Sequence, residues 1–96
     1  MDIDLNSVDV MHEPARDRFE IRVDSYVAEL TYVLHGNTIL FTHTGVPAAI
    51  EGNGLGSKLV TAGLDYARAN KLKVQSICWF VTEYIRQHPE YRDLLK

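Results

Sequence analysis

The sequence contains very little cysteine and no long apolar run, and each absence excludes a class of protein. Cys78 is its only cysteine, so the chain forms no internal disulfide, which is typical of reducing compartments. No segment approaches the roughly 18–20 consecutive apolar residues that cross a bilayer. The first residues, Met-Asp-Ile-Asp, lack the apolar core of a secretory signal. We therefore expect a cytoplasmic protein with no membrane partner.

The sequence also lacks an excess of positive charge. Its 10 lysines and arginines are outnumbered by 13 acidic residues, which gives a formal net charge of −3. A nucleic-acid-binding surface needs a basic stripe, or aromatic residues interleaved with basic ones, and neither is present. The four histidines and the cysteine do not have the spacing of metal ligands. We expect no nucleic-acid partner and no metal.

The 96 residues suffice for a single domain over 1–96, and the first half has the patterns of strands. Turn-forming residues at 24–25 and 35–37 separate three segments that are alternating or rich in β-branched residues. These segments predict an antiparallel meander. Pro14 would interrupt a central strand, so a short edge strand or coil is expected before it. The predicted strands of the meander are residues 18–23, 26–34 and 38–44.

The second half combines helical and strand patterns. Apolar residues at three- and four-residue steps predict a helix from Leu55, which Asn70 closes in a left-handed conformation. A further strand is predicted over residues 73–80, followed by a short helix that Thr82 caps and that ends near Gln87. A last turn or two follows. The meander, the central helix, the further strand and the short C-terminal helices make an α+β fold.

A glycine-rich loop stands where the central helix is expected to begin: Gly52, Gly54 and Gly56 are followed by Ser57. The first turn of a helix has unpaired N–H groups, and glycines let a phosphate approach them closely. A flexible turn is the alternative interpretation. A dinucleotide motif counted from Gly52 requires glycine where Ser57 stands, and a phosphate loop of the Walker type requires Gly-Lys-Ser/Thr, whereas Lys58 here follows Ser57. Neither of these two motifs fits.

A third pattern does fit. Val46, Gly54 and Gly56 resemble the acetyl-CoA signature of the GNAT acetyltransferase superfamily: Arg or Gln, two residues, Gly, one residue, then Gly or Ala. Glu51 stands at the Arg or Gln position, where a carboxylate is unfavourable beside a pyrophosphate. Trp79 stands where a short, stand-alone GNAT subgroup is expected to have proline. The resemblance to that subgroup is carried by residues 19–24, 41–47, 57–60, 66–68, 78–80 and 84–91.

The resemblance implies that acetyl-CoA is the cosubstrate and that its acetyl group moves directly to an amine in a ternary complex. Backbone N–H groups of the loop would bind the pyrophosphate, and the pantetheine arm would pair with an exposed strand edge. The N–H of Val46 would stabilise the developing oxyanion. The expected acetyl-CoA-binding residues are Thr44, Val46, Gly52, Asn53, Gly54, Leu55, Gly56, Ser57 and Lys58.

Three residues are candidates for the catalytic chemistry. Tyr84 is the candidate general acid for the leaving thiolate, with a core tyrosine as the alternative. His43 alternates with Phe41 and Ile39, so we expect it to face inward, where it would accept the amine proton unless its role is structural. Cys78 lies near the C-terminal end of the last predicted strand and would approach the thioester or act as a nucleophile, although a single buried cysteine is ordinarily a small hydrophobic residue.

Two other functions stay open on the sequence. The small size and the lack of an evident general base suit a noncatalytic acyl-CoA-binding regulatory module. A cysteine-based thioesterase would need Cys78 as its nucleophile. The acceptor amine, a small molecule or a protein, is unassigned. The chain is expected to be a monomer or a homodimer.

Overall fold

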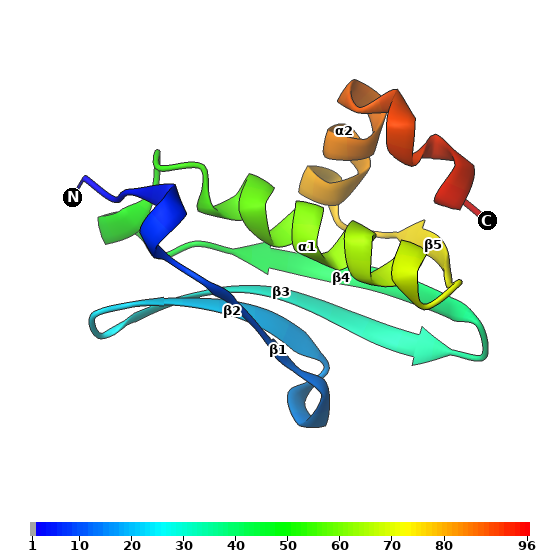
Figure 1. Ribbon diagram of the computed structural model, residues 1–96, viewed down its shortest axis with the longest axis horizontal. Coiled ribbons are helices and arrows are strands. Elements are labelled where there is room, and N and C mark those ends of the chain that lie inside the picture. Colours follow the sequence, from blue (N-terminus) through cyan, green and yellow to red (C-terminus); the bar gives the residue numbers. More distant parts are fainter. Residues whose placement is uncertain (1) are drawn as a thin grey trace.

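One mixed sheet with helices on one side forms the fold (Figure 1). The structure is a computed structural model that describes residues 2–96. The strands lie in the order β1-β2-β3-β4-β5, with the first four antiparallel and β5 parallel to β4. This arrangement confirms the predicted α+β fold and its antiparallel meander. The elements are η1 (Leu5–Ser7), β1 (Val10–Glu13), η2 (Pro14–Arg16), β2 (Arg18–Val23), β3 (Tyr26–His35), β4 (Thr38–Gly45), η3 (Ala48–Ile50), α1 (Leu55–Ala69), β5 (Lys73–Ser76), α2 (Trp79–Gln87) and η4 (Pro89–Leu94).

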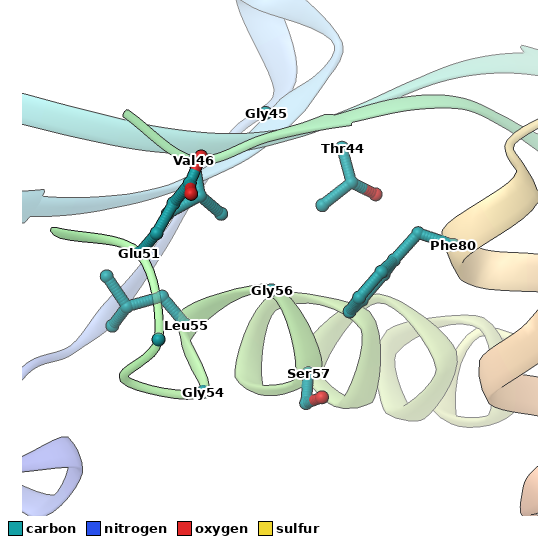
Figure 2. Close-up of a pocket in the computed structure, with 10 residues that line it drawn as sticks. Thr44, Gly45, Val46, Glu51, Gly54, Leu55, Gly56, Ser57 and Phe80 are labelled. Carbon is teal, nitrogen blue, oxygen red and sulfur yellow. The ribbon is translucent and has the colours of Figure 1, made fainter. Parts of the chain in front are cut away.

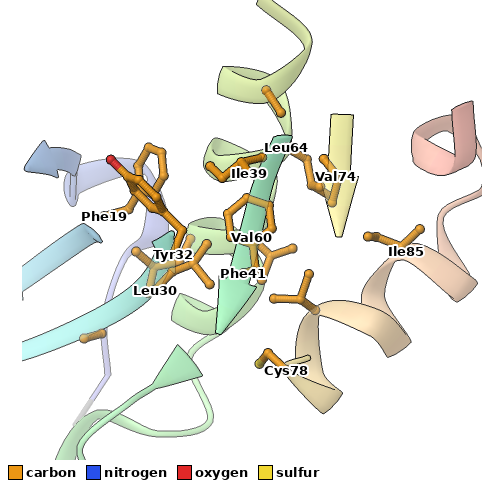
Figure 3. Packing of buried hydrophobic residues seen from close by; sticks show 14 of the residues in the cluster. Phe19, Leu30, Tyr32, Ile39, Phe41, Val60, Leu64, Val74, Cys78 and Ile85 are labelled. Atoms are coloured by element: carbon orange, nitrogen blue, oxygen red, sulfur yellow. The ribbon is translucent and has the colours of Figure 1, made fainter. Parts of the chain in front are cut away.

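Both α-helices lie on one face of the sheet, and within residues 2–96 the opposite face, which we call the open face, carries no α-helix (Figure 1). Inward positions of β2, β3 and β4 meet the apolar stripe of α1 in a buried layer (Figure 3). Burying one large apolar side chain contributes roughly 1.5–3 kcal/mol. No helix of the described residues has the length and apolar character needed to cross a membrane. The layer includes Phe19, Ile21, Leu30, Tyr32, Ile39, Phe41, Leu59, Val60 and Leu64.

Strand β1 is a short edge strand, as the position of proline predicted. It ends at Glu13, and Pro14 begins the one-turn helix η2. Asp17, with φ of 53°, then turns the chain back into β2. Proline lacks an N–H, so it would interrupt a strand with neighbours on both sides but is tolerated where an edge strand ends.

The junction between β5 and α2 differs from the prediction. β5 ends at Ser76 rather than at residue 80, and α2 begins at Trp79, so Thr82 is not its cap. Ser76 Oγ accepts the Cys78 N–H at 3.1 Å, and Thr82 Oγ1 donates to the same oxygen at 2.9 Å. These hydrogen bonds to Ser76 Oγ, which we call the hydrogen-bonding hub at Ser76, hold the turn that leads the chain out of the sheet. Val81 and Ile85 are both buried, and their separation of four residues is typical of one face of a helix. This packing outweighs the strand preference of the residues before Val81.

The C-terminal end of α1 also differs from the prediction. Asn70 has φ of −101° and is not left-handed, although its side-chain amide donates to the carbonyl oxygen of Tyr66 at 2.8 Å. The left-handed residue is Lys71, with φ of 56°. The turn thus falls one residue later than expected.

A β-bulge in β4 decides which side chains face the helices. Thr31 of β3 is opposite His43, but the next residue, Tyr32, is opposite Phe41, so Thr42 is an extra residue on β4. An extra residue shifts the alternation of side chains by one position. His43 therefore lies exposed on the open face, and the expectation that it faces inward is wrong. Thr44 takes the helix-facing side instead.

Candidate active site

Strands β4 and β5 pair along only part of their length, and this opens the sheet. Their last paired residues are Phe41 and Ser76, after which the N–H of Ile77 donates to the Phe41 carbonyl at 3.0 Å. β4 then continues to Gly45 along β3, while the chain beyond Ile77 turns into α2. Among the described residues, the last part of β4 has no second neighbouring strand. Its backbone groups on that side can pair with a strand-like ligand.

A pocket of about 600 Å³ occupies this gap. The end of β4 forms one wall, the glycine-rich loop and the first turn of α1 lie opposite, and Phe80 of α2 points in from the side (Figure 2). We call this cavity the donor pocket. Its lining residues are Thr44, Gly45, Val46, Glu51, Gly52, Gly54, Leu55, Gly56, Ser57 and Phe80.

The start of α1 makes one end of the donor pocket favourable to an anion. Gly54 precedes the helix with φ of +80°, and the first intrahelical bond runs from the N–H of Lys58 to the Gly54 carbonyl at 3.1 Å. The N–H groups of Leu55, Gly56 and Ser57 consequently have no acceptor within the helix. The helix is 15 residues long, so its dipole places positive potential at the same point. This end of the pocket fits a phosphate.

At the opposite end, α2 contacts both β4 and α1. The ring of Phe80 lies so close to Gly56 that a Cβ on Gly56 would stand 3.0 Å from Cζ of the ring. Cys78 Sγ lies 3.4 Å from the hydroxyl oxygen of Thr44, which lines the pocket. Cys78 is buried and touches a pocket residue without itself lining the cavity.

The sequence of residues 18–94 matches the family described as GCN5-related N-acetyl-transferase. The match spans most of the chain, including β4, the glycine-rich loop and α2. This chain belongs to that family. The predicted resemblance to GNAT acetyltransferases is thereby confirmed.

Curated relatives and a solved structure agree with this GNAT assignment. The chain is 31% identical over 87 residues to Protein NATD1 of Xenopus tropicalis, which covers 88% of this chain and 80% of that protein. It is 32% identical over 83 residues to Protein NATD1 of Homo sapiens, covering 83% of this chain and 74% of that protein. The solution structure of a GCN5-like protein from Staphylococcus aureus superposes with a TM-score of 0.74 at 29% identity, over 96% of this chain and 91% of that one.

Two of the residues expected to bind acetyl-CoA in this GNAT domain do not line the donor pocket. Lys58 Nζ donates to the carbonyl oxygens of Leu5 and Val8, which holds its charge against the N-terminal segment. Asn53 accepts the N–H of Ile3 at 3.2 Å and donates to the Ile50 carbonyl at 3.0 Å, so it braces the loop. The other expected residues, Thr44, Val46, Gly52, Gly54, Leu55, Gly56 and Ser57, all line the pocket.

Tyr84 lies beside the donor pocket rather than in it. Its hydroxyl is 2.6 Å from the hydroxyl of Thr61, and its ring stacks on His88 with centroids 3.9 Å apart. It lines a smaller hollow of about 150 Å³, which shares Ser57 and Phe80 with the donor pocket. Phe80 therefore stands between the candidate general acid and the pocket.

His43 lies on the other side of β4. It lines a separate hollow of about 330 Å³ on the open face, and Gly45 and Val46 belong to both cavities. A Cβ on Gly45 would stand 3.0 Å from His43 Nε2, so the imidazole lies against the backbone that separates the cavities. Sequence reasoning missed Phe80 as a pocket residue; the only signal was its place two residues after Cys78 in the resembling segment.

Proposed function

We propose that this protein is an acetyl-CoA-dependent N-acetyltransferase that moves an acetyl group directly to an amine in a ternary complex. The observation that carries the proposal is the composition of the donor pocket. One end has the free N–H groups of a helix start, and the other has the open edge of β4. These two surfaces suit the pyrophosphate and the amide-containing pantetheine arm of coenzyme A. Membership of the GNAT family supports the same chemistry.

The backbone donors of the donor pocket, together with the open space at its loop, support the binding of acetyl-CoA. The N–H groups from Leu55 to Ser57 would hold the pyrophosphate, and the edge of β4 near Val46 would hold the pantetheine. Gly52 has nothing within 4 Å of the position of a Cβ, which leaves space for a ligand at the loop. When bound, acetyl-CoA supplies the activated acyl group as a thioester.

Glu51 is the one feature of the pocket that opposes an anion. It lines the cavity and no lysine or arginine does so among the described residues. Its side chain runs toward β4 rather than toward the start of α1 (Figure 2). A carboxylate at this position lowers the affinity for a pyrophosphate without blocking the N–H groups. We expect binding that depends on backbone groups and is weaker than a side-chain cation would give.

We assign the oxyanion donor, the proton acceptor and the general acid by their positions relative to Val46. Its N–H is the proposed donor to the oxyanion that develops at the acyl carbon. An aliphatic amine must lose a proton before it attacks, since its pKa is about 10.4. His43, against Gly45 on the open face, is the proposed proton acceptor. Tyr84 remains the proposed general acid that protonates the leaving thiolate. For this role its hydroxyl must give up its hydrogen bond with Thr61 and form one with the thiolate.

A thermal-shift titration with acetyl-CoA tests the proposal, with ATP and NAD as controls. A ligand at about a hundredfold over its dissociation constant stabilises the fold by roughly 2.7 kcal/mol, which is several degrees for a domain of this size. A shift selective for acetyl-CoA, followed by amine-dependent release of free thiol, is the expected result. The absence of a selective shift at millimolar acetyl-CoA would contradict the proposal.

The second candidate function is a noncatalytic acyl-CoA-binding module. It is favoured by the position of Tyr84, whose hydroxyl is bound to Thr61 and separated from the donor pocket by Phe80. This module would bind acetyl-CoA and release no thiol with any amine. The thiol-release assay therefore distinguishes the two functions once binding has been measured.

A further inference from the structure

Gly45 forms the wall between the donor pocket and the hollow on the open face. Both cavities also share Val46, so the end of β4 is accessible from two sides. On the helix side, the donor pocket is bounded by the loop, α1 and Phe80. On the open face, no helix of the described chain covers the hollow. The hollow therefore lies directly across the end of β4 from the donor pocket, next to Val46.

Two polar side chains converge on Gly45 from that side. A Cβ on Gly45 would stand 3.0 Å from His43 Nε2 and 3.7 Å from Cγ of Glu29. Glu29 is the residue opposite Gly45 in the β3–β4 pairing, which fixes its side chain beside the glycine. The imidazole of His43 and the side-chain methylene of Glu29 thus both lie beside the position that a Cβ of Gly45 would occupy. The hollow is completed by Val27 and Pro47.

The charges around the hollow leave Glu29 able to bind a cation. Arg18 approaches Oε1 of Glu29 at 3.5 Å, but the same guanidinium also pairs with the fully buried Glu20. Burial alone raises the pKa of Glu20, but hydrogen bonds from Arg22 and Arg18 outweigh it and leave that pKa below its usual value. Glu20 is therefore ionised and shares Arg18 with Glu29. Among the described residues that line the hollow there is no lysine or arginine.

We propose that this hollow is the acceptor site, that it takes a positively charged aliphatic amine, and that Glu29 is the residue that selects it. The inference rests on the proposed acetyltransferase function. An aliphatic amine is an ammonium ion at neutral pH, whereas an aromatic amine is neutral. Glu29 binds the ammonium beside Gly45, and His43 removes one proton. The C–N bond then forms as the C–S bond breaks. The nitrogen loses its second proton as the thiolate gains one, which gives an N-acetyl amide and free coenzyme A, and His43 releases its proton to solvent.

The kinetic test compares butylamine with aniline as acceptors at saturating acetyl-CoA, by thiol release. In Glu29→Gln, we expect the KM for butylamine to rise about five- to tenfold and the KM for aniline to stay unchanged. Glu29→Asp keeps the charge and should recover part of the loss. Glu90→Gln, a matched loss of one exposed carboxylate on η4, should behave as wild type. An equal change for both amines, or none for butylamine, would overturn the inference.

A second measurement tests the hollow without turnover. Butyltrimethylammonium carries the positive charge and cannot be acetylated, so its binding is followed by the NMR amide shifts of Gly45 and Val46. We expect saturable shifts in wild type and Glu90→Gln, and at least a fivefold weaker response in Glu29→Gln. No saturable shift in wild type, or the same shift in Glu29→Gln, overturns the acceptor site. If calorimetry detects no binding of acetyl-CoA to the wild-type protein, that result instead overturns the proposed function.

Discussion

The two sides of the end of β4 differ in the groups that they offer to a ligand. The donor pocket presents mainly backbone: the N–H groups at the start of α1 and the free edge of the strand. The hollow on the open face presents side chains, the carboxylate of Glu29 and the imidazole of His43. Backbone donors survive substitution of the side chains around them, which makes Glu51 compatible with the proposed acetyl-CoA site. Side-chain recognition changes with single substitutions, so the ligand preference of the proposed acceptor site can vary on a constant fold.

The largest effect is expected from filling the start of α1. Any Cβ at Gly56 stands 3.0 Å from the Phe80 ring, and a valine adds two methyl groups at this crowded position in the first turn of α1. We expect Gly56→Val to weaken acetyl-CoA binding by about a hundredfold or more in calorimetry. Ala62→Val, on the same helix outside the donor pocket, is the matched control. Retained binding in a folded Gly56→Val would show that the ligand does not use this helix start.

A smaller but specific effect is expected at the candidate general acid. Tyr84→Phe should lower kcat by about a hundredfold with an unchanged dissociation constant for acetyl-CoA, because only proton transfer to the thiolate is lost. Tyr91→Phe is the control, since the Tyr91 hydroxyl donates to Asp65 at 2.9 Å and lines neither cavity. An unchanged kcat in Tyr84→Phe would mean that the hydroxyl has no catalytic role and serves only in its hydrogen bond with Thr61.

The third substitution sharpens the contrast between backbone and side-chain recognition. Glu51→Gln removes the only carboxylate among the described residues that line the donor pocket. We expect acetyl-CoA to bind about fivefold more tightly at low salt, with a smaller gain at high salt, because an exposed charge is screened. Calorimetry at two ionic strengths measures both values. Weaker binding in Glu51→Gln would mean that the carboxylate contacts the ligand favourably.

The smallest effect is expected at Cys78. In direct transfer the thiol does not react, so Cys78→Ala should keep activity within about threefold of wild type while losing the contact with Thr44. Thiol-release kinetics and a melting curve measure activity and stability separately. Complete loss of activity in a folded Cys78→Ala would favour an acyl-cysteine route or a thioesterase.

Much of the fold follows from local patterns. Alternating residues and turn chemistry located β2, β3 and β4, and the apolar stripe located α1. The prediction failed where tertiary contacts compete with local preference. Residues 77–80 look like a strand, yet the hydrogen-bonding hub at Ser76 and the burial of Val81 and Ile85 start a helix at Trp79. Propensity is a weak guide at such junctions because packing overrides it.

The lining of the donor pocket could be predicted from the sequence where it consists of backbone. The glycine spacing identified the start of α1, and the expected residues from Gly54 to Ser57 line the pocket. Lys58 lies outside the pocket because it bonds to the carbonyl oxygens of Leu5 and Val8, distant partners that cannot be read from its own surroundings in the sequence. His43 was misplaced because one extra residue at Thr42 reverses the alternation on which its orientation was based.

The sequence by itself determined most of the strand and helix segments, the glycine-rich loop and the family, since each depends on residues close together in the chain or on their order. Only the tertiary structure decided that β4 leaves β5 after Phe41, that the bulge sends His43 to the open face, and that Glu29 meets it at Gly45. These are contacts between residues distant in sequence. Their geometry depends on strand register, which the packing of the whole sheet against α1 sets.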